Sequence, residues 1–521
     1  MKELKLEELT ARQKLGMAYT AYINGWNVTK EDTDFIIDLI RNHSLGAVWI
    51  QAGLAYAEEM MAKVKEAADY PILIMTDAEG GIDGCFVGKH NAIGTTGSEK
   101  HAYAFGKVVG VKARKLGYNT VCDPVVDMND GGVRSLGTDK EMVSKLAVAE
   151  AKGMHDGGVL TICKHYPGGS NPNKIDSHTA ESVSPDTKEE LINYSIYPYR
   201  KLMEQNLMDG LMVQHKRFTN IDPNRPATLS KPVINIIREL GFDGFAITDA
   251  LCMMGIRAKY NDVDAKGFAI EAGIDTILPY TVRNIEKFNE FCEAYDKGLI
   301  PDDRLDEAAR RILDAQHKVT LLPKDSEISD DEMDTFNRIN KDGVYRMVDD
   351  GVLPTISRDG KHYFCVMIRN EFQVKDGKVE VDTFSNGWHC PDKIEAKIKE
   401  LFPNSVVDFI KEFPTQEEMF HTLENSLGFE EVVFMSFTEA LAYTGPEQLT
   451  HRFKNLVDAM QKTDRISTLI HFGNPHVVEV LPHIPRVIFG GQSEGSVETT
   501  IEVLAGVYPA NGIPTYEFKL K

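Results

Sequence analysis

The sequence predicts an α/β protein that consists of a (β/α)8 TIM-like barrel followed by a second α/β domain. Three observations lead to this fold class. The chain has 521 residues, whereas a single hydrophobic core stops growing near ~250–300 residues. Short apolar runs alternate with segments of helical period, and the alternation resumes after an acidic stretch. Continuous apolar strands between amphipathic helices are typical of a parallel sheet that is covered on both faces.

Eight apolar, β-branched runs are the predicted strands of the barrel. They are Thr20–Ile23, Ala47–Ile50, Ile72–Asp77, Val121–Pro124, Leu160–His165, Gly210–His215, Gly244–Asp249 and Asp275–Pro279. Helical patterns lie between most of them, at Ala55–Ala68, Ser98–Leu116, Lys140–Asp156, Lys188–Gln205 and Ser230–Leu240. Eight strand–helix units match a (β/α)8 barrel with insertions. An open, doubly wound sheet is the alternative that the same pattern allows.

The polar, acidic segment Lys324–Asp334 predicts a boundary between two domains. We assign residues 1–323 to the barrel, 324–345 to a linker and connecting helix, and 346–521 to the second domain. The predicted strands of that domain are Tyr363–Ile368, Ser405–Ile410, Glu431–Phe437, Ile466–Phe472 and Arg486–Gly490. Helices such as Gln448–Met460 lie between several of them, so the second domain also reads as α/β.

The composition excludes several classes of protein. Lys and Arg total 58 against 79 Asp and Glu, which gives a formal net charge of −21. This charge repels phosphate backbones and anionic lipid, so we expect neither nucleic acid nor a membrane surface as a partner. The first residues lack the apolar segment of a signal peptide, and no ~20-residue apolar run follows. The seven cysteines are scattered without a CxxC pair, which favours a reduced, cytoplasmic protein with cysteines as small buried side chains.

Ionisable residues close four of the predicted strands. Asp77 ends the third, Lys164 and His165 end the fifth, His215 ends the sixth and Asp249 ends the seventh. The C-terminal ends of barrel strands meet at one rim, where barrel enzymes carry their active sites. A buried ionisable side chain is costly unless it faces a solvated or functional cavity. We therefore expect a site at this rim.

The side chains at these strand ends suggest particular roles. A carboxylate such as Asp249 suits a nucleophile that forms a covalent intermediate; the alternative is an Asp that caps the following helix. Lys164 and His165 offer donors, and Asp77 an acceptor, to the hydroxyl groups of a neutral polar ligand. For Asp77 the alternative is again a helix cap, beside a tight turn.

A long polar stretch after the fifth strand contains Asp176-Ser177-His178. A carboxylate two residues before an imidazole can orient it and tune its pKa, and histidine can donate and accept a proton near neutral pH. The alternative is a solvated loop histidine. Because the loop is long and hydrophilic, we expect it to be mobile and to close over substrate.

Several short motifs occur in a fixed order along the chain. They are Thr76-Asp77-Ala78-Glu79-Gly80-Gly81, Asp123-Pro124-Val125-Val126-Asp127, Arg134-Ser135-Leu136-Gly137, Lys164-His165-Tyr166-Pro167-Gly168, Asp176-Ser177-His178 and Ile247-Thr248-Asp249-Ala250-Leu251. Together they resemble glycoside hydrolase family 3, in its bacterial β-N-acetylglucosaminidase branch. Phe472-Gly473-Asn474-Pro475 and Ala510-Asn511-Gly512-Ile513-Pro514 resemble the second domain of that family, an α/β sandwich.

The resemblance implies a retaining glycosidase that releases terminal β-linked N-acetylglucosamine and needs neither a cofactor nor a metal. Asp249 matches the nucleophile of the family, and Asp176 with His178 matches the acid/base pair of the branch. The positions that hold the sugar hydroxyls are matched by Asp77, Arg134, Lys164 and His165, and His215 matches a histidine after the sixth strand. His178 would protonate the leaving oxygen while Asp249 attacks, and neutral His178 would then activate water.

The sequence departs from the branch around the expected sugar site. Ile82 and Cys85 occupy the positions where the branch carries arginines, and Gly169 stands where a second histidine is common. The stretch after His178 lacks the usual Leu-Pro. An arginine that binds hydroxyl or anionic groups cannot be replaced by cysteine, so the sequence leaves the exact sugar open.

Other functions fit parts of the same pattern. A phosphorylase, or a β-glucosidase of the same family, is one, because a neutral imidazole does not repel phosphate as a carboxylate would. A metal-dependent barrel hydrolase with His165, His215, Asp77 and Asp249 as ligands is another, although the first strand lacks an HxH pair. A sugar-binding protein that has lost catalysis is the third. In each case the expected partner is a small molecule, and the second domain could stabilise the barrel or mediate a homodimer.

Overall fold

A computed structural model describes residues 1–24, 28–54, 56–128, 133–349, 356–368, 370–383, 388–439 and 448–518. The chain forms two compact units. The barrel unit comprises residues 1–86, 99–130 and 138–336, and the second unit comprises residues 87–98, 131–137 and 337–521. The two units are defined by their internal contacts, and neither is continuous in sequence. The domain boundaries at 323 and 346 therefore stay predictions.

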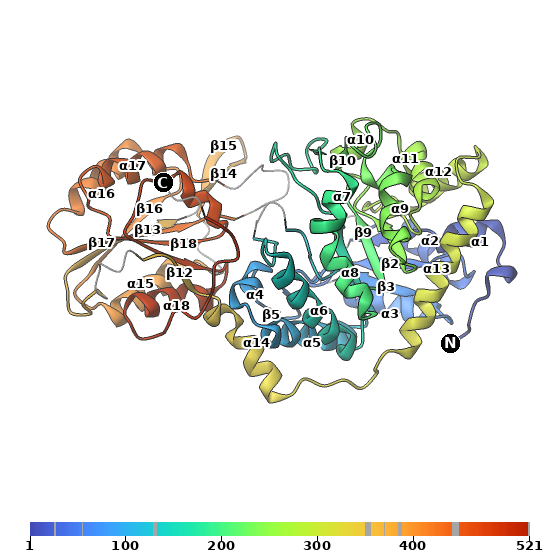
Figure 1. Ribbon diagram of the computed structural model, residues 1–521, viewed down its shortest axis with the longest axis horizontal. Helices are drawn as coiled ribbons and strands as arrows, with labels where there is room; N and C mark the ends of the chain where they lie inside the picture. The colour runs from blue at the N-terminus through green and yellow to red at the C-terminus, as the bar shows by residue number, and fades with distance from the viewer. Residues whose placement is uncertain are drawn as a thin grey trace. The chain divides into compact units, whose positions relative to one another are not determined.

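The barrel unit is built on a parallel sheet, as predicted (Figure 1). Within the described residues, seven strands lie in the order β1-β2-β3-β6-β7-β9-β11, and each pairs in parallel with its neighbour. Their bounds are Thr20–Ile23, Ala47–Ile50, Leu73–Thr76, Thr120–Val121, Leu160–Tyr166, Gly210–Val213 and Phe245–Thr248. Sheet order thus follows chain order, as in a (β/α)8 barrel.

Residues 275–277 close the barrel where an eighth strand is predicted. Thr276 bridges Ile247 of β11, and Ile277 bridges Tyr19, the residue before β1. The amide of Thr20 donates to the Ile277 carbonyl at 3.0 Å. The predicted strand Asp275–Pro279 is therefore present as two bridges rather than as a regular strand.

Helices accompany the strands. Their bounds are α1 Ala11–Met17, α2 Lys30–Arg41, α3 Ala57–Ala67, α5 Glu99–Leu116, α6 Lys140–Gly157, α7 Lys188–Glu190, α8 Tyr197–Glu204, α9 Lys231–Glu239, α10 Met254–Arg257, α11 Asp262–Ala272, α12 Asn284–Asp296 and α13 Asp302–Leu321. The helix predicted over Lys188–Gln205 is divided by a π-helical turn, Leu191–Ser195, ahead of Pro198. Proline lacks an amide donor and clashes with the preceding turn, so the regular hydrogen-bond ladder cannot continue through it.

A buried ion cluster lies at the start of the eighth strand position. Asp275 is fully buried and pairs with Arg238 at 2.7 Å, with Arg311 at 3.3 Å and with Arg304. Removing one partner from such a cluster leaves the others charged and desolvated, which costs about 3–5 kcal/mol. The cluster therefore holds this end of the barrel together.

The second unit has a mixed sheet between two layers of helices. In the part of the chain that the structure describes, six strands lie in the order β12-β19-β18-β17-β13-β16, with only β12 antiparallel to its neighbour. Their bounds, in that order, are Tyr345–Asp349, Arg486–Gly490, Thr468–Phe472, Glu431–Phe437, His362–Ile368 and Val406–Lys411. Helices α16 (Gln416–Asn425) and α17 (His451–Gln461) cover one face, and α15 (Pro391–Leu401) and α18 (Glu494–Leu504) cover the other (Figure 1). This is the predicted α/β sandwich.

The second unit also contains segments that come earlier in the chain. Helix α4 (Asn91–Thr96) belongs to it, and the amide of Ile513 donates to the Thr95 carbonyl at 2.8 Å. Helix α14 (Asp330–Asp342) runs from the barrel unit into the second unit along the chain. The glycine-rich turn before α18 opens a helix, because the hydroxyl of Ser493 accepts the Ser496 amide as its N-cap.

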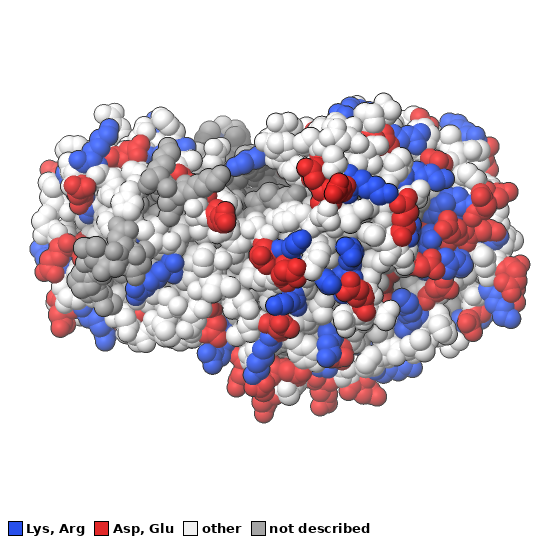
Figure 2. Space-filling model, viewed as in Figure 1, with Lys and Arg blue, Asp and Glu red and all other residues white. Residues whose placement is uncertain are grey.

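Acidic and basic side chains are interspersed over the face of the barrel unit that Figure 2 shows. Exposed ion pairs of the barrel unit include Lys188 with Glu239 at 2.6 Å and Lys201 with Glu204 at 2.9 Å. Each such pair contributes about 0–1 kcal/mol to stability. Among the residues described, none of the helices has the length and apolar character needed to cross a membrane.

Candidate active site

Asp249 follows β11 directly, at the C-terminal end of the strand. Its amide donates to the Val213 carbonyl at 3.0 Å, which continues the pairing with β9 by one residue. Its Oδ1 accepts the amide of Ala250 at 2.7 Å. The backbone that follows the strand therefore orients the carboxylate.

His215 lies beside Asp249, fully buried after β9. Its Nε2 is 3.0 Å from the Ala250 carbonyl, and its Nδ1 is 2.7 Å from the Thr228 hydroxyl. Burial lowers the pKa of His215, although Asp249 opposes this shift. A neutral imidazole has one donor. Since a carbonyl only accepts, we assign the proton to Nε2, so that His215 holds the peptide next to Asp249.

The acid/base candidates form a tight pair. The Nδ1 of His178 lies 2.6 Å from Asp176 Oδ1, which also accepts the amide of His178 at 2.9 Å. Their side chains are 31% and 22% exposed, so a ligand can reach the imidazole. Both His178 and His165 lower the pKa of His215 through their charge, which places them near it. The structure thus gathers the three histidines and Asp249 at one rim.

Lys164 is almost fully buried at the same rim. Its Nζ lies 2.6 Å from Asp77 Oδ1 and 2.7 Å from Glu79 Oε1. Burial opposes the charge of the ammonium, but the surrounding acidic groups, Asp77 first among them, raise its pKa well above the ordinary value. Lys164 is therefore a buried cation that fixes Asp77, which is itself 33% exposed.

Two acidic residues that the sequence did not predict as site residues contact the predicted ones: Asp127 contacts His165, and Glu79 contacts Lys164. Asp127 Oδ2 lies 2.7 Å from His165 Nδ1, and Asp127 Oδ1 accepts the His165 amide at 3.2 Å. Both acids lie in the motifs quoted above, but the sequence does not tell which strand end each one faces. Arg134 is exposed on segment 131–137 of the second unit, and its contact with a sugar stays a prediction.

An aromatic pair at the barrel rim was also missed. Tyr22 of β1 and Tyr280, which follows the eighth strand position, have ring centroids 4.2 Å apart. Burial, then Tyr22 and Asp77, raise the pKa of the Tyr280 hydroxyl, so it stays protonated at neutral pH. Tyr280 has a φ of 52°, a left-handed conformation that is uncommon for residues other than glycine.

The geometry explains two of the departures from the branch. Gly169 has a φ of 86°, and a Cβ there would lie 2.5 Å from the Phe218 ring. A histidine therefore does not fit at this position without a shift of the backbone or of Phe218. Ile82 is buried in the short hairpin of β4 (Gly81–Ile82) and β5 (Cys85–Phe86), where an arginine would lose its hydration.

One alternative function was a metal-dependent hydrolase with His165, His215, Asp77 and Asp249 as the metal ligands. Both ring nitrogens of His215 are bound to Thr228 and Ala250, and Asp77 is paired with the ammonium of Lys164, which would repel a cation. This arrangement disfavours a metal among these four residues.

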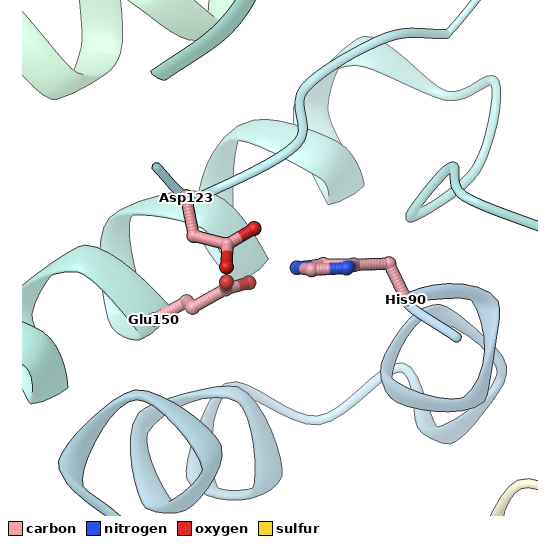
Figure 3. A group of neighbouring side chains, drawn as sticks. All are labelled: His90, Asp123 and Glu150. Atoms are coloured by element: carbon pink, nitrogen blue, oxygen red, sulfur yellow. The ribbon is translucent and has the colours of Figure 1, made fainter. Parts of the chain in front are cut away.

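A pair of buried carboxyl groups lies elsewhere in the barrel unit. Asp123, after β6, and Glu150, on α6, are fully buried, point toward one another in Figure 3, and have oxygens within 4.8 Å. His90, the third side chain drawn there, is buried on segment 87–98 of the second unit. Asp123 helps to keep Lys164 charged.

The fold and the site define an α/β-barrel protein with carboxylates and a carboxylate–imidazole pair at the C-terminal ends of its strands. The chain belongs to glycosyl hydrolase family 3, because residues 3–315 match the profile of the glycosyl hydrolase family 3 N terminal domain. The predicted resemblance is therefore confirmed.

The known proteins that resemble this chain match different lengths of it. "Beta-hexosaminidase A" of Pseudoalteromonas piscicida is 26% identical over 303 residues, and the chain spans about half the length of that relative, 50% of it against 51% of this chain. The structure of a glycoside hydrolase family 3 beta-N-acetylglucosaminidase from Paenibacillus sp. str. FPU-7 has a TM-score of 0.80 at 24% identity and covers 98% of this chain and 100% of that one. Beta-glucoside phosphorylase BglX bound to 2FGlc has a TM-score of 0.81 at 22% identity, covering 98% and 95%. These two structures show a shared fold.

Proposed function

We propose that this protein is a retaining β-N-acetylhexosaminidase that removes terminal β-linked N-acetylglucosamine from small glycosides. Membership of glycosyl hydrolase family 3 and similarity to a beta-hexosaminidase support this activity. The observation that carries the proposal is the Asp176–His178 contact of 2.6 Å in the same barrel unit as Asp249. A retaining glycosidase needs this combination of a proton donor and a carboxylate nucleophile.

The proposed reaction has two steps. In the first, an oxygen of Asp249 attacks the anomeric carbon while the glycosidic bond breaks, and the leaving oxygen takes the proton from His178. Asp176 accepts a hydrogen bond from Nδ1, so the transferred proton is the one on Nε2. In the second, neutral His178 removes a proton from water, which displaces Asp249 from the sugar.

The remaining residues act on the sugar or on the nucleophile. Asp77, fixed by Lys164, accepts hydrogen bonds from sugar hydroxyls, and Arg134 and His165 are further candidates for hydroxyl contacts. His215 was predicted to bind substrate, and we now propose that it orients the backbone beside Asp249 as well. No cofactor takes part in this scheme.

Covalent trapping tests the proposal. A 5-fluoro-β-N-acetylglucosaminyl fluoride forms the glycosyl–enzyme faster than the enzyme can hydrolyse it. Peptide mass spectrometry should find the label on Asp249, and Asp249→Asn should take up none. Label on another carboxylate would refute the assignment of the nucleophile.

The sugar is tested with a panel of nitrophenyl glycosides. We expect β-N-acetylglucosaminide to be cleaved with the highest kcat/KM, ahead of β-glucoside and β-N-acetylgalactosaminide. A preference for glucose by more than about tenfold, or 1.4 kcal/mol of transition-state binding, would contradict the proposed substrate.

Phosphorolysis is the second candidate, because the proton donor is an imidazole that does not repel phosphate once neutral. The similar fold of a beta-glucoside phosphorylase supports considering it. Turnover with and without added phosphate separates the two reactions. Sugar 1-phosphate as the main product would favour phosphorolysis, and a rate and product independent of phosphate would exclude it.

We further propose a cytoplasmic location. All seven cysteines are unpaired, which suits a reducing compartment. Cell fractionation of the native host would test this, and recovery of the activity outside the cell would contradict it. The homodimer is tested by light scattering, where a mass near 58.2 kDa would exclude it.

A further inference from the structure

The acid/base pair is held in a compact turn. The Asp176 carbonyl accepts the amides of Thr179 and Ala180 at 3.0 and 3.2 Å, in addition to the contact between the Asp176 and His178 side chains. The internal geometry of the pair is thus fixed by Asp176. The position of this turn relative to Asp249 must come from contacts outside it.

The first outside contact comes from the loop that follows the nucleophile. The amide of Gly255 donates to the Ser177 carbonyl at 3.0 Å, and the amide of Met254 donates to the His178 carbonyl at 3.2 Å. Both donors lie on α10, which begins five residues after Asp249. The backbone of the nucleophile loop therefore binds the backbone of the acid/base loop directly.

Gly255 is packed closely against that turn. A Cβ at this position would lie 3.1 Å from the Ser177 carbonyl oxygen and 3.3 Å from the Cβ of His215. The first distance involves backbone, which cannot rotate away as a flexible side chain can. An alanine at 255 would therefore push the turn, and His178 with it, by a few tenths of an ångström.

The second outside contact is an ion cluster at Glu181, three residues after His178. Arg217 binds both carboxylate oxygens of Glu181 at 3.0 Å, and Lys259 binds Oε2 at 2.7 Å. The Glu181 side chain is only 16% exposed. A bidentate pair has a defined geometry as well as attraction, so it fixes a position better than a single contact does.

Arg217 and Lys259 belong to the framework of the barrel rim. Arg217 lies in β10 (Arg217–Phe218), which pairs in parallel with β8 (Val183–Ser184) of the acid/base loop. The Arg217 amide also donates to the Ser182 carbonyl at 2.9 Å. Lys259 lies just after α10. Glu181 thus joins the acid/base loop to the chain after the sixth strand and to the chain after the seventh.

We propose that Glu181 and Gly255 are positioning residues, which hold the Asp176–His178 pair at its working distance from Asp249. This inference rests on the proposed function.

Leaving-group dependence tests the inference, because only a poor leaving group needs the proton from His178. The value of kcat/KM reports the cleavage of the glycosidic bond. Glu181→Gln keeps the size of the side chain and removes its charge. We expect it to lower kcat/KM about 10- to 100-fold for phenyl β-N-acetylglucosaminide, but less than about threefold for the 2,4-dinitrophenyl glycoside, which departs unprotonated.

Two further variants test the same positioning. Gly255→Ala should show the same selective loss. Lys259→Met removes a half-exposed partner, should fold normally, and should show a smaller loss in the same direction. Glu271→Gln is the matched control, since it removes another arginine partner, that of Arg225, at 35% exposure. It should leave the ratio of the two substrates unchanged.

The outcomes distinguish failure of the positioning inference from failure of the proposed function. An equal loss on both glycosides, or no loss, in Glu181→Gln and Gly255→Ala would overturn the positioning role. His178→Ala separates this failure from failure of the proposed function. If His178→Ala itself shows no dependence on the leaving group, the acid/base assignment is wrong. If it shows the dependence and the other variants do not, only the positioning inference fails.

Discussion

Replacing Lys164 by methionine should destabilise the barrel unit and weaken its sugar site at the same time. The substitution keeps an unbranched side chain, one atom shorter, and removes a charge that contacts two carboxylates. Asp77 and Glu79 would then remain as neighbouring anions without their shared cation. Like charges at this distance repel one another, so both carboxylates should move or one should bind a proton.

The structure sets the size of the effect. At 2.6 Å and an effective dielectric constant of about 20, each contact has a gross Coulomb energy of about 6 kcal/mol. Water reaches Asp77, which is 33% exposed, and reduces this energy. Breaking a buried ion pair from one side costs about 3–5 kcal/mol, and we take the lower end, about 3 kcal/mol. For a unit as large as the barrel, the melting temperature should fall by about 4–5 °C.

The assay compares Lys164→Met with Lys188→Met by circular dichroism during heating. The two lysines have the same 2.6 Å contact, but Lys188 and its partner Glu239 are 50% and 61% exposed. We expect the control to shift the melting temperature by less than about 2 °C, since exposed pairs contribute about 0–1 kcal/mol. Adding Glu79→Gln to Lys164→Met should recover part of the loss. Equal melting temperatures of both single variants would refute the reasoning.

Three more predictions follow from the buried polar groups. Thr228→Val removes the hydroxyl that contacts His215 Nδ1. The change should lower the free energy of unfolding by about 1–3 kcal/mol and should lower kcat, while KM stays within twofold, about the error of the assay. An unchanged kcat would contradict the role of His215. Burial lowers the pKa of His471 from 6.5 to about 4. The free energy of unfolding should therefore be highest above pH 6.5, where His471 is neutral in both the folded and the unfolded chain, and should fall as the pH falls toward 4. Urea unfolding of the second unit should lose about 3 kcal/mol over this range, and His471→Gln should flatten the profile; parallel profiles would refute this. Asp275→Asn should lower the free energy of unfolding by about 3–5 kcal/mol in urea, and a loss below about 1 kcal/mol would show that its arginines find other partners.

The strands were predictable because their signal is local. The predicted bounds of Thr20–Ile23, Ala47–Ile50 and Glu431–Phe437 coincide with β1, β2 and β17. The run Val121–Pro124 was predicted too long, because Pro124 has no amide to donate to the next strand. Short hairpins such as β4–β5 were not predicted, since two-residue strands have no period to detect.

The candidate site was predictable only in part. Ionisable residues at strand ends mark the rim of a barrel, so Asp249 and Lys164 could be found from their place in the sequence. Their partners depend on which distant segments meet. Thr228 reaches His215 from a turn ahead of α9, and the distance between the two in the sequence does not reveal the contact. The lack of space at Gly169 likewise depends on Phe218, which lies on β10.

The way the chain passes between the two units limits how the protein can be divided. Segments 87–98 and 131–137 are packed in the second unit although barrel sequence lies on both sides of each. The Asn91 amide donates to the Val133 carbonyl, so the two segments also bind one another. A fragment that starts at residue 337 would lack both segments. A fragment that ends at this residue would contain both segments without the rest of the second unit. Recombination with a relative therefore has to exchange three stretches of sequence together, and a single crossover in the linker would produce two damaged halves.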